Sequence, residues 1–150
     1  MSNPVQAKSA ESNLWFLNLN RVFNHPVEDV FNAWTNPELL KNWFCNNGEA
    51  EFDVVEGGMF HVFVQCESNG IAELKGEYLE IIKNEKLVFT WVWQNEPLSF
   101  AGETVVTVEF IDLDGKTELK LLHEGFSSEE FSCRHTEGWG EALDRYERNA

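Results

Sequence analysis

Cysteine is scarce in this sequence, and its placement excludes two classes of protein. The chain has 150 residues and only Cys45, Cys66 and Cys133. Their number is odd, they lie far apart, and no Cys-x-x-Cys pair occurs, which argues against both a disulfide framework and a thiolate metal cage. We therefore expect a protein of a reducing compartment, the cytoplasm.

Positive charge is also in short supply. The sequence has 11 lysines and arginines and 26 aspartates and glutamates, so the formal net charge is −15 and the sequence pI is about 4.5. The few basic residues are scattered and form no run. Such a chain repels phosphate backbones and anionic membrane surfaces, so we expect no nucleic-acid partner.

Long apolar runs are missing as well. No stretch approaches the length needed to cross a bilayer, and the N-terminus lacks the basic start and apolar core of a secretion signal. We therefore expect no membrane insertion. The length suits one domain, and we predict a flexible tail over residues 1–12 followed by a single domain over residues 13–150.

Motifs that would indicate a metal, nucleotide or nucleophile site do not occur. The sequence has no His-x-x-x-His, His-Glu-x-x-His or clustered Cys/His spacing, and no Gly-x-Ser-x-Gly elbow. Gly57-Gly58 precedes a strand pattern rather than a helix, so it indicates a hairpin turn and not a phosphate loop. We predict no metal, no cofactor and no assigned catalytic residue.

Apolar and polar residues alternate in seven segments, which are separated by turn-forming residues. Connections this short join only neighbouring antiparallel strands. The predicted strands are residues 14–23, 50–55, 59–67, 71–82, 87–93, 103–112 and 117–126.

Helical patterns occupy the remaining parts of the chain. Pro26 and Pro37 each suit the start of a short helix after the first strand. A long helix is predicted from about Ser128 to Arg148, opened by a capping box from Ser127 to Glu130. The fold class is therefore α+β, with a curved seven-stranded antiparallel sheet wrapped around the long C-terminal helix and a cavity where they meet.

Large aromatic rings are the main candidates for function. Alternation places Phe89, Trp91 and Trp93 on one face of their strand, where they either line a ligand pocket or pack as an ordinary core. The candidate ligand-binding residues are Phe60, Val62, Tyr78, Phe89, Trp91, Val106, Val108, Leu121, His123, Phe131, His135 and Trp139.

Two histidines are expected on the concave side. His123 shares a strand face with Leu119 and Leu121, and His135 lies on the apolar stripe of the long helix. Each is a candidate to bond a polar ligand atom or to act as a general base, and each is equally a candidate to hydrogen-bond a neighbour. His61 is expected on the opposite face of the sheet.

Five segments in order carry a resemblance to a known family. They are residues 21–44, 57–60, 76–81 with 87–91, 117–126 and 135–139. Together they resemble the activator-of-Hsp90-ATPase homologue 1-like domains of the START-like, or Bet v 1-like, superfamily (SRPBCC) over roughly residues 14–148. The resemblance implies a helix-grip fold.

The resemblance also implies a range of functions. The first, which we favour over an enzyme, is a small-molecule binding module with an internal hydrophobic, aromatic-lined pocket for a lipid-like or aromatic ligand. The alternatives are a pocket enzyme of the cyclase, dehydratase or hydrolase type, for which His123, His135 and Tyr78 are the candidates, and a stress- or chaperone-associated protein. Two-domain Hsp90 activators engage the chaperone through a separate N-terminal domain, and only about a dozen residues precede the fold here, so Hsp90 binding is not expected. We expect a monomer or weak homodimer.

Overall fold

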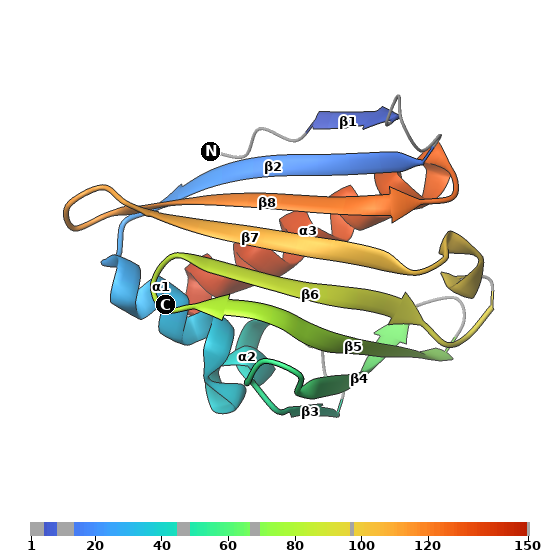
Figure 1. Cartoon of the computed structure of the whole chain (residues 1–150), viewed down its shortest axis with the longest axis horizontal. Coiled ribbons are helices and arrows are strands. Elements are labelled where there is room, and N and C mark those ends of the chain that lie inside the picture. The colour runs from blue at the N-terminus through green and yellow to red at the C-terminus, as the bar shows by residue number, and fades with distance from the viewer. Residues whose placement is uncertain (1–4, 9–13, 45–48, 67–69, 97, 150) are drawn as a thin grey trace.

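The computed structural model describes residues 5–8, 14–44, 49–66, 70–96 and 98–149, shown in Figure 1. Within these residues one antiparallel sheet has the strand order β1-β2-β8-β7-β6-β5-β4-β3. The helix-grip fold predicted from the sequence is confirmed. The strands are β1 (Val5–Lys8), β2 (Trp15–Phe23), β3 (Ala50–Phe52), β4 (Met59–Cys66), β5 (Gly70–Ile82), β6 (Lys86–Trp93), β7 (Thr104–Asp112) and β8 (Thr117–Phe126).

Strand β1 is an addition to the seven predicted strands. Its four residues pair antiparallel with β2, from Val5 opposite Asn18 to Lys8 opposite Trp15. This strand lies within the segment predicted to be a flexible tail, of which residues 1–4 and 9–12 lie outside the described part of the chain. Four residues are too few to show a reliable alternation, and the edge of β2 supplies hydrogen-bonding partners that the local sequence does not reveal.

The two short helices lie where the prolines predicted them. Helix α1 (Val27–Thr35) follows Pro26, whose carbonyl oxygen accepts hydrogen bonds from the amides of Asp29 and Val30. Helix α2 (Pro37–Trp43) is capped by the Asn36 side chain, which accepts a 3.0 Å bond from the amide of Glu38. Both helices cover one end of the sheet (Figure 1).

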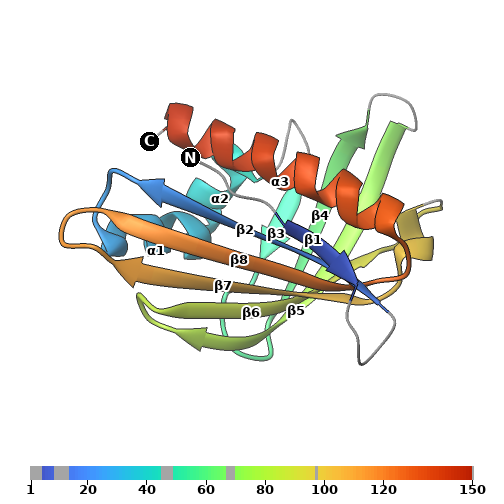
Figure 2. The same ribbon diagram turned by 90° about the horizontal axis from the view of Figure 1, so that it is seen from above.

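The long helix α3 (Glu129–Asn149) lies across the concave side of the sheet, as Figure 2 shows. The residue that caps its first turn differs from the predicted one, Ser127. The cap is Ser128, whose Oγ accepts a 3.3 Å bond from the amide of Phe131. Ser127 is not available, because its hydroxyl donates a 2.6 Å bond to the carbonyl of Phe100 in the short 3-10 helix η1 (Leu98–Ala101).

Polar contacts attach the C-terminal half of α3 to the rest of the molecule. Arg21 on β2 is buried, and its Nη1 lies 2.8 Å from Asp144 and 3.2 Å from Glu147. Arg145 donates from Nε to the carbonyl of Trp43 at 3.0 Å, which ties α3 to α2. No helix in the described ranges has the length and hydropathy to cross a membrane.

Candidate functional site

A cavity of about 270 Å³ lies beneath the N-terminal and central turns of α3. Its walls come from β4, β5 and β6, from η1, from the residue after α2, and from one stripe of α3. The lining residues are Phe44, Val64, Leu74, Trp91, Trp93, Leu98, Arg134, His135, Gly138, Trp139, Glu141, Ala142 and Arg145.

The predicted ligand-binding residues fall into three groups. Trp91, His135 and Trp139 line this cavity. Phe60, Tyr78 and Phe89 border a separate void of only about 10 Å³, the size of a single water-sized probe, and their rings pack on one another at centroid distances of 5.7–5.8 Å. The others lie in or against the core without lining either space: Val62, Val106, Val108, Leu121, His123 and Phe131.

Several lining residues were not among the candidates. Arg134, Gly138 and Arg145 lie on the α3 stripe at steps of four and seven from one another, so extending the helical period beyond its apolar members would have found them. Phe44 and Leu98 have no such signal, because the tertiary fold alone brings a helix end and the η1 turn to the cavity.

Indole rings form one wall of the cavity. The rings of Trp91 and Trp139 have centroids 5.0 Å apart and are tilted by 44°, and Trp139 stacks on Trp34, outside the lining, at 5.8 Å with an interplanar angle of 25°. All three rings are buried. Aromatic pairs of this kind contribute about 0.5–1.5 kcal/mol per pair beyond area burial, which helps to hold these rings in place.

His123 lies behind this wall with both ring nitrogens engaged. The indole N–H of Trp139 donates to Nδ1 at 3.0 Å, and because an indole can only donate, Nδ1 must be unprotonated. The proton of the neutral ring is therefore on Nε2, which donates to Thr104 Oγ1 at 2.8 Å. The Thr104 hydroxyl in turn donates to the carbonyl of Trp91 at 2.8 Å.

His135 repeats the arrangement at the cavity surface. The indole N–H of Trp93 donates to Nε2 at 2.8 Å, so the neutral ring carries its proton on Nδ1 and donates it to the carbonyl of Phe131 at 2.7 Å. A tryptophan thus fixes the tautomer of each buried histidine.

Burial keeps both imidazoles neutral. It lowers the pKa of His123 well below its ordinary value, and His135 nearby lowers it further. Burial likewise lowers the pKa of His135 to about 4, with the Phe131 carbonyl opposing the shift and Arg134 adding to it. Protonating either ring would also set two donors against each other at the indole.

One indole lining the cavity lacks a partner. Trp91 Nε1 is buried and has no hydrogen bond among the described residues; the same is true of Trp34 Nε1, which belongs to the smaller void. An unpaired buried donor costs about 1–3 kcal/mol.

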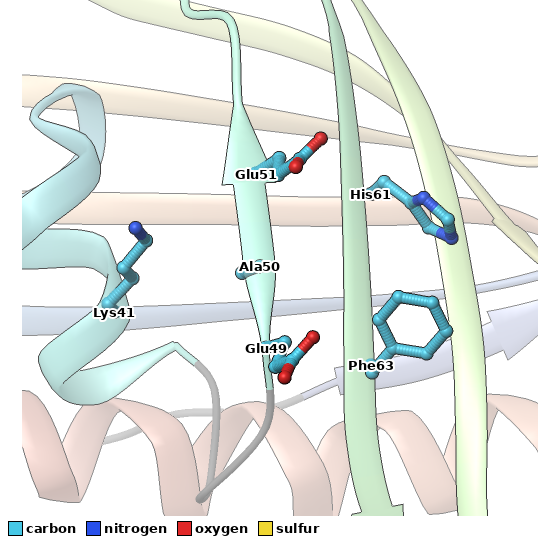
Figure 3. A pocket seen from close by; sticks show the side chains of 6 residues that line it. All are labelled: Lys41, Glu49, Ala50, Glu51, His61 and Phe63. Carbon is cyan, nitrogen blue, oxygen red and sulfur yellow. The ribbon is translucent and has the colours of Figure 1, made fainter.

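A second hollow lies on the outer face of β3 and β4, with a volume of about 400 Å³. Figure 3 shows Glu49 and Glu51 extending toward the strand that carries His61 and Phe63. His61 lies on this outer face, as predicted, and its Nε2 is 2.6 Å from Glu73. The lining of this hollow is mainly polar and charged, so it suits an apolar ligand less well, and we favour the cavity beneath α3.

Within the described ranges, no three His, Cys, Asp or Glu side chains are arranged to hold a metal ion.

Sequence comparisons agree with the fold. A family model described as activator of Hsp90 ATPase homolog 1-like protein matches residues 24–148. The chain is 31% identical over 111 residues to the activator of 90 kDa heat shock protein ATPase homolog 2 of Mus musculus, covering 73% of this chain and 30% of that protein. It is 24% identical over 123 residues to homolog 1 of Homo sapiens, covering 82% of this chain and 33% of that protein. The chain thus spans about a third of these relatives, whose names describe the longer proteins.

Solved structures share the architecture. Protein CV1439 of Chromobacterium violaceum superposes with a TM-score of 0.77 at 21% identity, covering 89% of this chain and 94% of that chain. The Mll3558 protein of Rhizobium loti also gives 0.77, at 16% identity and 99% coverage of both chains. These likenesses concern the fold. On the strength of the family model and the mouse relative, the chain belongs to the activator of Hsp90 ATPase homolog 1-like family.

Proposed function

We propose that the protein is a small-molecule binding module whose ligand occupies the cavity beneath α3. The observation that carries the proposal is a cavity of about 270 Å³ with Trp91, Trp93 and Trp139 in its walls. Ligand sites in proteins are typically concave, largely apolar and supplied with a few polar groups. This cavity has that composition.

The cavity volume limits the size of the ligand. It lies just below the range of about 300–1,000 Å³ usual for drug-sized compounds and above the roughly 150 Å³ of an engineered cavity that holds benzene. The indole rings in the wall favour an aromatic body of one or two fused rings, or a short acyl chain.

The hydrogen bonds of the histidines favour binding over acid–base catalysis. A general base needs a lone pair within reach of the substrate, and a catalytic histidine usually has an orienting carboxylate. Here the unprotonated nitrogens of His123 and His135 each accept from a tryptophan, and within the described residues neither ring has a carboxylate partner. The enzyme alternative would require breaking one of these bonds.

Binding of 2-naphthamide, a neutral two-ring compound with a carbonyl oxygen, tests the proposal. We expect saturable one-to-one binding by isothermal titration calorimetry. Gly138 lines the cavity and a Cβ there would have no atom within 4 Å, so Gly138→Leu should fill space and weaken binding at least tenfold.

The matched control is Gly140→Leu, two residues along the same helix and outside the lining, where a Cβ also meets nothing within 4 Å. This variant should bind as the parent does. Circular dichroism checks that both variants are folded. The proposal is contradicted if no compound of this size binds, or if the two leucine variants lose affinity equally.

A further inference from the structure

The wall that α3 contributes to the cavity is cationic, in a chain of net charge −15. Arg134 and Arg145 line it together with one carboxylate, Glu141, and His135 is neutral there because of its lowered pKa. The charged lining residues therefore sum to +1, and Glu130, which pairs with Arg134, lies outside the lining. The lining itself is thus opposite in sign to the molecule.

Arg145 is held in position for a ligand. The side chain is half-buried, and its Nε donates to the carbonyl of Trp43 at 3.0 Å. Among the described residues no carboxylate lies within ion-pair distance of its guanidinium. The backbone bond orients the group, and its charge is not neutralised by a neighbouring acid.

Arg134 is only weakly engaged. Its Nη2 lies 3.2 Å from Glu130 one turn earlier, and the two side chains are 50% and 69% exposed. Exposed pairs of this kind contribute about 0–1 kcal/mol, so a ligand carboxylate can replace Glu130 at little cost. The guanidinium fork suits such a group, since it donates two parallel bonds to a carboxylate.

We propose that the cavity selects aromatic carboxylates, with the carboxylate at the mouth in the positive field of Arg134 and Arg145 and the ring body against Trp91 and Trp139. This inference rests on the proposed function and specifies in addition that the ligand is an anion. Charge-assisted bonds are roughly twice as strong as neutral ones, and the partly buried mouth screens them less than bulk water does. Selectivity for the anion over its neutral isostere is the expected result.

A pair of probes measures that selectivity: 2-naphthoate and 2-naphthamide, which share the ring system and differ in charge. We expect the unmodified protein to bind 2-naphthoate at least tenfold more tightly, with a preference that falls as salt is added. Arg134→Gln should reduce the preference several-fold, because it should weaken the binding of 2-naphthoate more than that of 2-naphthamide. Arg145→Gln should do the same, with its fold checked by circular dichroism because the bond to Trp43 is lost.

Arg148→Gln is the matched control. Arg148 lies on the same helix, is exposed and does not line the cavity, so its removal changes the net charge equally without touching the mouth. It should keep the full preference. Equal affinity of the two probes for the unmodified protein overturns the charge selectivity and leaves the binding function standing. Retention of the preference in both Arg134→Gln and Arg145→Gln also overturns it, whereas failure of both probes to bind overturns the binding function itself.

Discussion

The indole N–H of Trp139 donates a 3.0 Å hydrogen bond to Nδ1 of His123, joining the centre of α3 to β8. Both side chains are buried, at 3% and 0% exposure. The bond fixes the histidine tautomer and holds the Trp139 ring at the cavity wall. A residue with two polar atoms in the core is thereby fully satisfied, which is the condition for burying it.

Removing one partner of this bond should destabilise the protein. Trp139→Phe leaves His123 Nδ1 as a buried acceptor without a donor, at about 1–3 kcal/mol in addition to the lost ring volume. Urea denaturation measures the change. A double-mutant cycle with His123→Phe isolates the pair, and we expect a coupling of about 0.5–3 kcal/mol. Strictly additive effects would show that the bond contributes nothing.

Acid should destabilise the fold before most carboxylates are protonated. The unfolded chain takes up a proton on His135 near its ordinary pKa of 6.5, whereas the folded protein does so only near a pKa of about 4. The unfolding free energy therefore falls as the pH drops from 6.5 to 4, and His135 accounts for about 3 kcal/mol of this loss. Above pH 6.5 this residue causes no loss of stability. His123 acts in the same direction.

The variant His135→Gln separates this effect from the titration of the acids. Its unfolding free energy should fall less between pH 6.5 and 5 than that of the parent, measured by urea denaturation at each pH. Identical pH slopes in the two proteins would mean that His135 is not buried as a neutral ring.

Two glycines should respond in opposite ways to the same substitution. A Cβ at Gly76 on β5 would overlap the carbonyl oxygen of Thr90 and the ring of Phe60, so Gly76→Ala should destabilise by several kcal/mol or prevent folding. A Cβ at Gly140 meets nothing within 4 Å, so Gly140→Ala should stabilise α3 by up to about 1 kcal/mol. Thermal unfolding compares them; a stabilised Gly76→Ala would contradict the packing between β5, β4 and β6.

Arg21 should control the order of the C-terminal half of α3. Its buried guanidinium contacts Asp144 and Glu147, and replacing it by Gln removes both ion pairs. We expect a loss of about 2–3 kcal/mol, scaled from charge-assisted hydrogen bonds, and faster amide hydrogen exchange in residues 141–149. Arg148→Gln, which removes an exposed arginine of the same segment, serves as the control and should exchange at the original rate.

The local parts of the fold could be read from the sequence, because local chemistry determines them. Pro26 and Pro37 precede or begin short helices, and strict alternation put His123 inside and His61 outside. The four-residue β1 was missed because its only cause is a neighbour in space. The helix is capped by Ser128 and not by the predicted Ser127 for the same reason. The Ser127 hydroxyl donates to the carbonyl of Phe100, which is distant in sequence.

The periodicity of the sequence predicted only part of the candidate site. Apolar spacing led to Trp91, His135 and Trp139, but it also led to Phe60 and Phe89, which pack tightly around a very small void. Alternation tells which way a ring points and not whether a partner fills the space beyond it. The arginines at the mouth were missed because the helical stripe was followed mainly through its apolar and aromatic members.

The signals of the indole N–H groups in a ¹⁵N-correlated NMR spectrum test the central claim most directly. Trp43 is the internal reference, because its N–H donates to the carbonyl of Ala33 at 3.0 Å and it does not line the cavity. On addition of 2-naphthoate we expect the Trp91 signal, assigned by its absence in Trp91→Phe, to shift strongly while that of Trp43 stays in place. An unchanged Trp91 signal at saturating probe, or equal shifts of Trp91 and Trp43, would contradict a ligand site beneath α3.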